Sequence, residues 1–497
     1  FGLPIAEAML LGLPVITTDW GGQKDFCNDK NSWLIDYEFT LSKSHFNLQN
    51  SYWAEPSIQH LGILLAEIYN SSENAIQKKT IPAQDLIKSF TWDKVVDKNI
   101  QSLNNYFCRF DNRISKIGWV STWSSKCGIA SYSRRFLNYM PDDIYVFSPY
   151  DEINQNISDN INLVNENHVI PSWNCTTAKD QDLNHLFTQV KNNQISSLII
   201  QFNFGFFNVN ELDLFINKLL DVNINVIMIL HSTIASDSNN SNYLYLLKDA
   251  LKKCTRILVH SVNDLNRLKN LNLIDNVSLF THPILDFENK KNKSYNKLLF
   301  KSSYKDKLHL VSYGFCLPGK GFPELIQAIN ILRNSHISFR LDVYSAIYSE
   351  EYQYVFQELV DLVNQLELNH LVNLSSEYIP ENQLLSTLSK HDLIIFPYQI
   401  SNESSSASVR DGLASMKPVI VTPLSIFDEI SDLVNFFKGT SPDDIANGLI
   451  EWYECQKAYP HIDSEKHLKR IQKINQRRYS LASQKLSSMI NSLEINQ

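Results

Sequence analysis

Short apolar runs alternate with amphipathic stretches along most of the 497-residue chain, and this alternation restricts the possible folds strongly. Apolar runs of about four to eight residues predict buried strands, and the amphipathic stretches between them predict helices. Strands that are joined through helices run parallel, and a parallel sheet is covered by helices on both faces. The sequence therefore predicts an α/β protein built from doubly wound parallel sheets.

The predicted strands form two sets, separated by a polar connection at residues 286–307 that is rich in Lys, Asn and Ser. The first set comprises Ile117–Val120, Ile144–Phe147, Ser197–Phe202, Asn225–Leu230 and Arg256–His260. The second set comprises Leu308–Tyr313, Phe339–Tyr344, Leu393–Pro397 and Pro418–Thr422. Since a single core rarely grows beyond about 250–300 residues, we expect two Rossmann-like sheets in succession and a further domain before them.

Charge and composition exclude several classes of protein. The formal net charge is −8, so the chain lacks the broad basic field with which nucleic-acid binders displace counterions, and no nucleic acid is expected as a partner. Apolar runs such as Val226–Leu230 are far shorter than the roughly 20 residues of a membrane-spanning helix. The seven cysteines include no CxxC pair, which is typical of reduced thiols. A cytoplasmic location is therefore expected, with any membrane contact peripheral at the inner face.

An internal repeat divides the chain further. The segment Glu7–Thr18 matches Asp411–Thr422 at a constant offset of 404 residues, which places Pro14 on Pro418. Both copies predict an acidic residue at the start of a helix, then a turn with proline, then a buried strand. The head of the chain thus repeats part of the region on the C-terminal side of the polar connection.

The first copy carries a family resemblance. Phe1–Ile16, with Gly21, Gly22 and Asp25 after it, resembles the end of the E-x7-E region of family 4 (group 1) glycosyltransferases, which have the GT-B fold. Trp53–Pro56 resembles a stretch found after this region in such enzymes. In the second copy Glu403 and Asp411 keep the spacing of the two acids, with Asp in place of the second Glu.

The resemblance implies a truncated first module and, after it, a complete second one. Residues 1–108 would be the C-terminal part of the first module, with Glu7 as the remnant of its site. In the second module the resemblance implies an N-terminal acceptor-side domain at 114–290, a nucleotide-sugar-binding domain at 305–470 and a C-terminal helix at 471–497 that returns towards the first domain. The two Rossmann-like sheets would face a cleft between them.

The acids and glycines of the second module are predicted to hold the sugar donor. The resemblance gives Asp411 the nucleotide ribose and Glu403 the donor hexose, and a carboxylate near a helix N-terminus gains from the helix dipole. The glycine turn at Gly314 and Gly321 would let backbone amides approach a diphosphate, and Lys320 would add a point charge. A helix N-cap and a solvated turn lysine are the structural alternatives for the acids and for Lys320.

Phe315 stands where many family members have an arginine directly after the first glycine. The usual contact between that arginine and the donor phosphate is therefore missing at this position. Arg410, one residue before Asp411, is the candidate to supply a guanidinium instead, as in relatives with a similar Glu-Ser-Ser-Ser…Val-Arg stretch. The alternative for Arg410 is a helix residue on the surface.

Two positions of the acceptor-side domain are predicted to contact the substrates. Gly128 lies in a Ser- and Gly-containing loop between a strand and a helix, which resembles the family's first loop. The resemblance implies that small residues there let donor and acceptor come close to the backbone, and a strand-to-helix turn without a ligand is the alternative. His231 comes directly after the strand Asn225–Leu230, and the carboxyl end of a parallel strand is where ligands meet the crevice. His231 is thus the catalytic candidate of this domain, with His260 and His282 as weaker ones. A hydrogen-bonded structural histidine is the alternative.

Together these residues and the family resemblance imply a metal-independent transferase without a cofactor. It would move a hexose from a nucleoside diphosphate sugar to a hydroxyl of a glycan or lipid-linked acceptor in polysaccharide synthesis. No Asp-x-Asp pair ends a strand in either half, so Lys, Arg and helix dipoles would neutralise the leaving diphosphate. The family is generally retaining, and the Glu-Ser-Ser-Ser…Val-Arg stretch suggests mannose. The alternatives are a non-catalytic carbohydrate-binding module and another GT-B enzyme such as a sugar-nucleotide epimerase.

Overall fold

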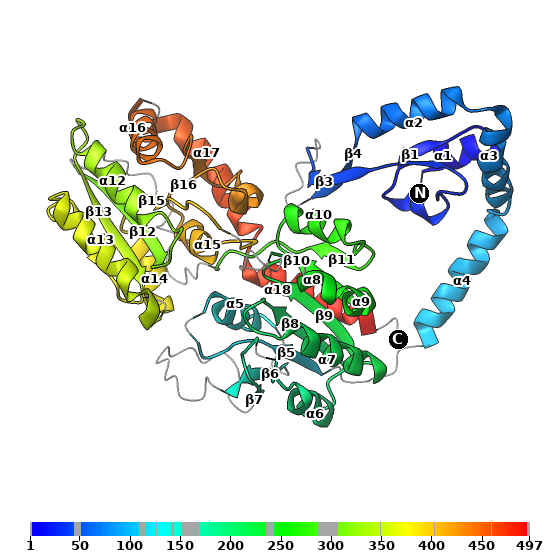
Figure 1. Ribbon diagram of the computed structural model, residues 1–497, viewed down its shortest axis with the longest axis horizontal. Coiled ribbons are helices and arrows are strands. Elements are labelled where there is room, and N and C mark those ends of the chain that lie inside the picture. Colours follow the sequence, from blue (N-terminus) through cyan, green and yellow to red (C-terminus); the bar gives the residue numbers. More distant parts are fainter. Residues whose placement is uncertain are drawn as a thin grey trace. The chain divides into compact units, whose positions relative to one another are not determined.

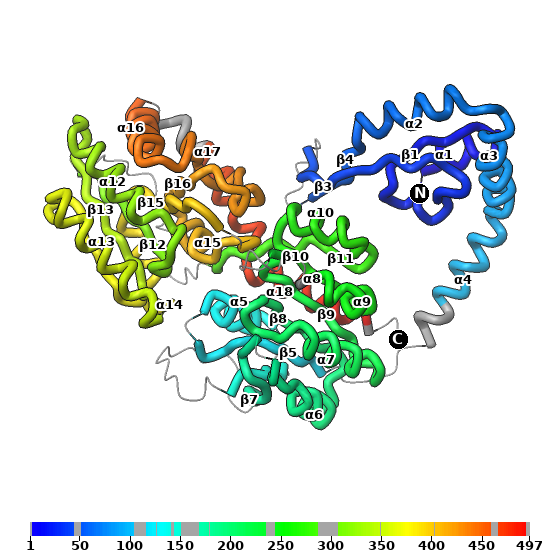
Figure 2. The backbone as a smooth tube through the Cα atoms, viewed as in Figure 1, coloured from blue at the N-terminus to red at the C-terminus, as the bar shows by residue number. Residues whose placement is uncertain are grey.

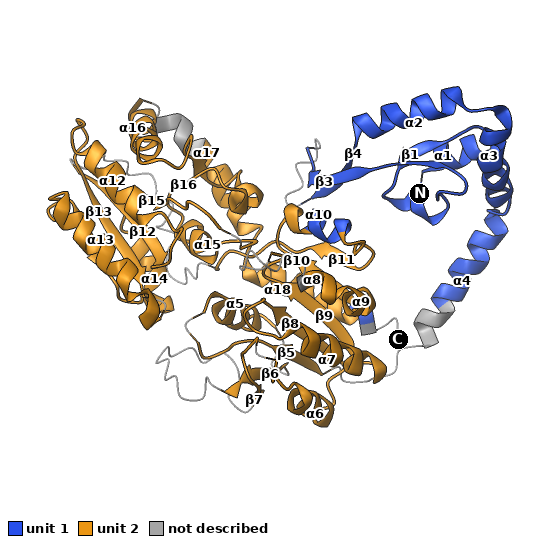
Figure 3. Cartoon of the chain, in the orientation of Figure 1, with its two compact units in different colours: residues 1–114, 265–270, 492–497 blue, residues 115–264, 271–491 orange. Residues whose placement is uncertain are grey.

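The computed structural model describes residues 2–43, 51–108, 116–125, 127–140, 144–150, 168–177, 179–234, 243–286, 307–347, 349–401, 403–458 and 460–494. The chain divides into two compact units (Figure 3). Unit 1 comprises residues 1–114, 265–270 and 492–497, and unit 2 comprises residues 115–264 and 271–491. Among the described residues, none of the helices combines the length and the apolar character needed to cross a membrane.

Unit 1 is built from two short two-stranded sheets and the helices around them. Its elements are α1 (Leu3–Leu10), β1 (Ile16–Thr18), η1 (Gly22–Asp25), β2 (Trp33–Ile35), β3 (Tyr37–Leu41), β4 (Tyr52–Pro56), α2 (Ile58–Asn70), α3 (Glu73–Lys88) and α4 (Trp92–Cys108). Strand β1 pairs with β2 in parallel, and β3 pairs with β4 antiparallel. The buried apolar residues of unit 1 include two separate clusters, one that includes Met9 and Phe26 and one that includes Trp33 and Leu64.

Unit 2 begins with a seven-stranded parallel sheet in the order β11-β10-β9-β8-β5-β6-β7. We call residues 116–286 the N-terminal sheet domain; within it, residues 265–270 are counted with unit 1. Its elements are β5 (Ile117–Val120), α5 (Gly128–Leu137), β6 (Ile144–Pro149), β7 (Val169–Trp173), α6 (Asn184–Asn192), β8 (Ser197–Phe202), α7 (Val209–Asp221), β9 (Asn225–Leu230), α8 (Tyr243–Leu246), α9 (Lys248–Lys253), β10 (Arg256–Val259), α10 (Val262–Asn270) and β11 (Val277–Leu279). All residues of the central strands β8 and β9 are buried, which matches their largely apolar sequences.

The second sheet has six parallel strands in the order β14-β13-β12-β15-β16-β17. We call residues 307–475 the C-terminal sheet domain. Its elements are β12 (Leu308–Phe315), α12 (Phe322–Leu332), β13 (Phe339–Ala346), η4 (Glu350–Tyr352), α13 (Gln353–Gln365), β14 (Val372–Ser375), α14 (Glu381–Leu388), β15 (Leu393–Phe396), α15 (Ala407–Ala414), β16 (Val419–Val421), η5 (Ser425–Ile430), β17 (Asn435–Phe436), α16 (Pro442–Ala458) and α17 (Pro460–Asn475). Helices cover both faces of this sheet (Figure 1), and each face has its own apolar core.

The last helix, α18 (Tyr479–Glu494), leads back to the N-terminal sheet domain. The Ser483 hydroxyl on this helix donates a hydrogen bond of 3.1 Å to the carbonyl of Phe136 on α5. The backbone can be traced through the seven-stranded sheet, the six-stranded sheet and back in Figure 2. Helix α18 therefore contacts α5 of the N-terminal sheet domain.

The predicted strands are present, with bounds that differ by a few residues. In unit 1, β2, β3 and β4 were not predicted. In the two larger sheets, four further strands, β7, β11, β14 and β17, were not predicted. All four are the outermost strands of their sheets. An edge strand is buried on one side only, so it needs no continuous apolar run; both residues of β17, for example, are exposed.

Candidate functional site

The strand order of each sheet indicates where a ligand would bind. In the six-stranded sheet the connections leave β12 towards β13 on one side and reach β15 on the other, so the order reverses between β12 and β15. A doubly wound sheet opens a crevice at the carboxyl ends of such strands. The loops after β12 and β15, at residues 316–321 and 397–406, therefore border the crevice of the C-terminal sheet domain.

Lys320 and Glu403 lie in these two loops and face each other. The Lys320 Nζ is 3.5 Å from the Glu403 Oε2 and 4.2 Å from the ring centre of Tyr398. Burial disfavours the charged lysine, but Tyr398 and Glu403 outweigh this effect and raise the pKa of Lys320. The Glu403 side chain is 59% exposed, so it remains open to a ligand. The structure thus brings together two of the predicted donor-site residues, at the switch point of the sheet.

The glycines around Lys320 have left-handed or related backbone conformations. Gly321 has φ 78°, and a Cβ there would lie 1.7 Å from the carbonyl oxygen of Pro397, so no other residue fits without a shift of the backbone. Gly314 has φ 152°, and its nearest side-chain neighbour is Ser408. The loops after β12 and β15 therefore touch through a glycine, and this contact places Lys320 beside the Glu403 loop.

Asp411 is held by a residue of the other sheet. Its Oδ1 accepts a hydrogen bond of 2.7 Å from Nη1 of Arg135 on α5, and Arg135 also pairs with Glu381, the first residue of α14. All three side chains are largely buried, with 7%, 12% and 6% exposure for Arg135, Glu381 and Asp411. Burial raises the pKa of Asp411, and Arg135 opposes that effect. Arg135 and Glu381 were not predicted from the sequence.

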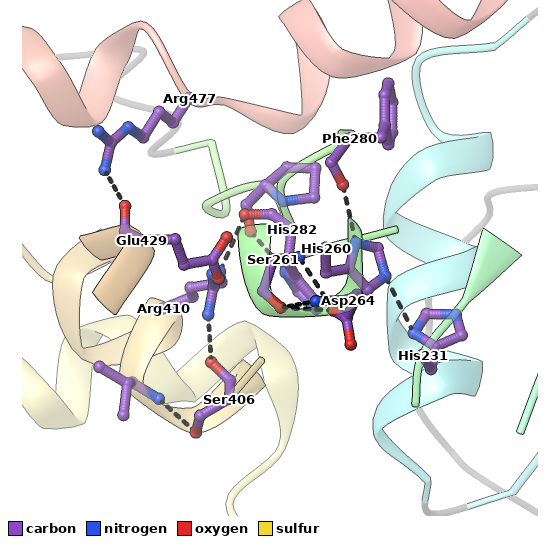
Figure 4. A network of polar contacts seen from close by, with 12 residues as sticks. His231, His260, Ser261, Asp264, Phe280, His282, Ser406, Arg410, Glu429 and Arg477 are labelled. Atoms are coloured by element: carbon purple, nitrogen blue, oxygen red, sulfur yellow. Dashed lines mark hydrogen bonds and ion pairs between the residues drawn. The ribbon is translucent and has the colours of Figure 1, made fainter. Parts of the chain in front are cut away.

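Arg410 lies in the interior, bound to three protein acceptors (Figure 4). It donates to the carbonyls of His282 at 2.9 Å and Ser406 at 3.0 Å, and it forms an ion pair with Glu429. The side chain is only 1% exposed, so the alternative of a surface helix residue is wrong. Its three contacts serve to join α15 to the segment after β11 and to η5. The predicted role of Arg410 at the donor phosphate stays a prediction.

His231 is in close polar contact with the side chains of two neighbours, Gln201 and His260. Its Nε2 lies 2.8 Å from Gln201 Oε1, and its Nδ1 lies 3.3 Å from Nε2 of His260. The Nδ1 of His260 in turn lies 2.8 Å from the carbonyl of Phe280, to which it can only donate (Figure 4). Both ring nitrogens of His231 thus have protein partners. Burial lowers the pKa of His231 and, to about 4, that of His260.

The ring of Tyr132 on α5 joins the three histidines of this region. Its centre lies 4.8, 5.7 and 4.9 Å from those of His231, His260 and His282. Burial lowers the pKa of His282 as well, and Arg410 adds to this effect. The structure therefore gathers the weaker candidates His260 and His282 around the same tyrosine as His231, as neutral rings.

Asp264 connects the two sheet domains and was missed by the sequence analysis. It lies in the first turn of α10, and its carboxylate accepts hydrogen bonds from Thr233 at 2.5 Å, from Ser261 at 2.6 Å and from Ser404 at 3.0 Å. Ser404 belongs to the loop that carries Glu403. The signal was present, because Ser261 and Asp264 form the Ser-x-x-Asp capping box that begins a helix.

The two remaining predicted residues are exposed. Gly128 begins α5, and a Cβ there would meet no atom within 4 Å, so packing does not demand a glycine. Glu7 lies on the exposed side of α1 in unit 1. A cavity of about 290 Å³ lies elsewhere in the C-terminal sheet domain, lined by residues of α16 and α17 such as Trp452 and Lys466, and none of the predicted site residues lines it. Among the described residues, no group of His, Cys, Asp or Glu side chains is arranged to hold a metal ion.

Comparison with known families agrees with this location. Residues 296–473 match the family model of glycosyl transferases group 1. The matched segment encloses Lys320, Glu403 and Asp411, and also the loops at the switch point. Among curated proteins, no sequence matches the chain.

Solved structures share the arrangement of both sheets. A glycosyltransferase from Rickettsia africae is 13% identical, with a TM-score of 0.59, 78% of this chain and 100% of that chain covered. HepE from Anabaena in complex with UDP is 12% identical, with a TM-score of 0.58 and coverage of 76% and 100%. Sucrose-phosphate synthase from Thermosynechococcus elongatus is 12% identical, with a TM-score of 0.56 and coverage of 77% and 100%. These likenesses show that the fold is GT-B.

Proposed function

We propose that the chain is a retaining family 4 glycosyltransferase that moves a hexose from a nucleoside diphosphate sugar to an acceptor hydroxyl. The observation that carries the proposal is the pair of Lys320 and Glu403 at the switch point of a group 1 domain. A cation and an exposed carboxylate beside each other suit a ligand with a diphosphate and hydroxyl groups. The complex of HepE with UDP supports a nucleotide as the ligand of this fold.

In this proposal each group of the site has one task. Lys320 and the N-terminus of α12 bind the diphosphate, since both favour negative charge. Glu403 accepts hydrogen bonds from the hexose, and Asp411 accepts them from the ribose. Gly314 and Gly321 let the backbone approach the phosphates, and Gly128 does so from the N-terminal sheet domain. His231 contributes the wall of the cleft next to the reacting sugar.

The chemical step needs no protein nucleophile and no metal or other cofactor. The acceptor oxygen forms a bond to C1 of the hexose on the face from which the phosphate oxygen departs. The acceptor proton passes to the leaving phosphate, and the positive charge of Lys320 stabilises that group. The acceptor is a glycan or a lipid-linked saccharide, and the donor sugar is mannose or another hexose.

The proposal is tested with the full chain and a panel of UDP, GDP and ADP sugars. Release of nucleoside diphosphate that depends on an added glycan acceptor supports the transferase. The K320M variant should bind the nucleoside diphosphate at least about tenfold more weakly, because it loses a charge-assisted contact. The matched control is K438M in the same domain, where Lys438 pairs with Glu451 on the surface.

Other outcomes decide between the alternatives. Turnover of the donor without any acceptor would favour another GT-B enzyme, such as an epimerase. Calorimetry that detects no binding of UDP, GDP or ADP would contradict the proposal and favour a carbohydrate-binding module without catalysis.

A further inference from the structure

Arg135 is a charged residue that crosses from one sheet domain to the other. It lies on α5 of the N-terminal sheet domain, between Tyr132 and Phe136 on the buried face of the helix. Its guanidinium reaches Glu381 on α14 and Asp411 on α15, both in the C-terminal sheet domain. A buried cation costs desolvation energy, so its two carboxylate partners are needed to keep it in the interior.

The contact uses only one oxygen of Asp411. Nη1 of Arg135 donates to Oδ1 at 2.7 Å, and within the described part of the chain no hydrogen bond to Oδ2 occurs. An ionised carboxylate can accept several hydrogen bonds. Oδ2 is therefore available to a ligand hydroxyl while Arg135 fixes the orientation of the carboxylate through Oδ1.

Several charged and titratable groups from different elements act on Asp411. Burial and the negative charge of Glu381 raise the pKa of Asp411, whereas Arg135 and Arg410 lower it. Tyr313 on β12 and Tyr479 on α18 also face it. Arg135 is the group among these that donates a hydrogen bond to the carboxylate, so it favours the ionised form most directly.

We propose that Arg135 is a positioning residue of the donor site, which holds Asp411 by Oδ1 so that Oδ2 accepts the ribose hydroxyls of a nucleoside diphosphate. This inference rests on the proposed function. It adds that a residue of the acceptor-side domain completes the nucleotide site of the other domain.

Arg410 is unsuited to this role. It belongs to the same helix as Asp411, but its guanidinium is bound to Glu429 and to the carbonyls of His282 and Ser406. An arginine that arrives from the opposite sheet can instead act on Asp411 only when the two domains are together. A role in holding Asp411 would therefore explain why the cation of Arg135 is kept in the interior although its burial costs desolvation energy.

The test measures the dissociation constant of UDP and GDP for the full chain as a function of pH. R135Q should weaken binding about tenfold or more, and the acid limb of the profile should move to higher pH, because Asp411 is protonated more easily without the guanidinium. E381Q keeps the contact between Arg135 and Asp411 and removes a negative charge, so its acid limb should move to lower pH. R333Q, which replaces an exposed arginine bonded to the carbonyl of Leu366, should change neither quantity.

The decisive readout is that the acid limb of the binding profile shifts to higher pH in R135Q and to lower pH in E381Q. A purely structural role of Arg135 would not produce shifts in opposite directions. The double variant R135Q/E381Q removes the cation together with one acid and serves if R135Q alone does not fold. This double variant should still bind UDP and GDP more weakly than wild type does. If wild type binds neither nucleotide, the proposed function fails and this inference fails with it. If wild type binds and R135Q retains its affinity and its acid limb, the inference alone is wrong.

Discussion

The two copies of the internal repeat have the same backbone and very different surroundings. In unit 1, α1 ends at a turn where Gly12 has φ 75°, and β1 then pairs in parallel with β2. In unit 2, α15 ends at a turn where Met416 has φ 65°, and β16 then pairs in parallel with β17. The repeat offset places Gly12 on Met416, so the shared sequence pattern produces the same order of helix, left-handed turn and strand.

The difference lies in what covers the helices. In α1 only Ala6 and Met9 are buried, and Glu7 is exposed. In α15 every residue from Val409 to Ala414 is buried, including the charged Arg410 and Asp411. Local sequence therefore determines the backbone, whereas partners from distant parts of the chain decide whether its acidic residue becomes part of a site.

The largest effect is expected from removing the charge of Arg410 on α15, which is paired with Glu429 in the interior. R410M should lower the free energy of unfolding of unit 2 by about 3–5 kcal/mol, because it leaves Glu429 buried and unpaired. Urea unfolding, with hydrogen exchange of α15 peptides to localise the change, measures this. The exposed R333M is the control, with an expected change within about 0.5 kcal/mol. A loss below about 1 kcal/mol for R410M would break the contrast between the two copies.

A smaller effect is expected from the residue pair Ala8 and Gly412, which the offset of 404 aligns. A Cβ at Gly412 would lie 2.9 Å from the buried ring of Phe396, so G412A should destabilise unit 2 by roughly 1–3 kcal/mol through overpacking. The helix α1 already carries an alanine at this place. G448A is a comparison in the same domain, since its Cβ would also meet a ring, that of Phe437. A G412A chain that unfolds like wild type would show that α15 tolerates an added methyl group and is packed loosely.

The buried histidines of unit 2 are expected to make its stability depend on pH in the acid range. Burial lowers the pKa of His260 from its ordinary value of 6.5 to about 4, so between these values the unfolded chain binds a proton that the folded chain does not. The stability contributed by the neutral ring is present above this window and is lost as the pH falls through it. The expected loss at about pH 5.5 is about 1.4 kcal/mol.

Melting curves at about pH 7.5 and about pH 5.5 check this expectation. H260N is the matched variant, because an asparagine amide can donate to the carbonyl of Phe280 as the ring does but does not titrate. Its melting temperature should depend less on pH than that of wild type. An equal pH dependence of both chains would remove His260 as the cause.

Much of the fold could be predicted because it depends on local signals. The central strands β8 and β9 matched their predicted bounds, since strands buried on both faces are rich in apolar residues along most of their length. Lys320 and Glu403 were predicted as neighbours through the family resemblance, and they meet because they follow strands on either side of the point where the strand order reverses. The edge strands could not be predicted, because a strand with an exposed side does not need an apolar run.

The partners of the buried charges could not be predicted in the same way. Arg135 is separated from Asp411 by 276 positions, and no local pattern joins the two. One hint existed, since Arg135 lies between Tyr132 and Phe136 on the apolar face of a helix, where an arginine needs a partner. Which acid would serve is a matter of tertiary structure alone.

The smallest expected effect belongs to the acid of the first copy. E7Q should change the free energy of unfolding by less than about 0.5 kcal/mol, because Glu7 is exposed and no ion pair or side-chain hydrogen bond of it occurs among the described residues. Urea unfolding with hydrogen exchange of α1 peptides measures the change. Q84A is a useful comparison, since the Gln84 amide donates to the carbonyl of Leu10 and its loss should loosen the end of α1. An E7Q effect above about 1 kcal/mol would mean that the first copy, like the second, holds its acid through a partner.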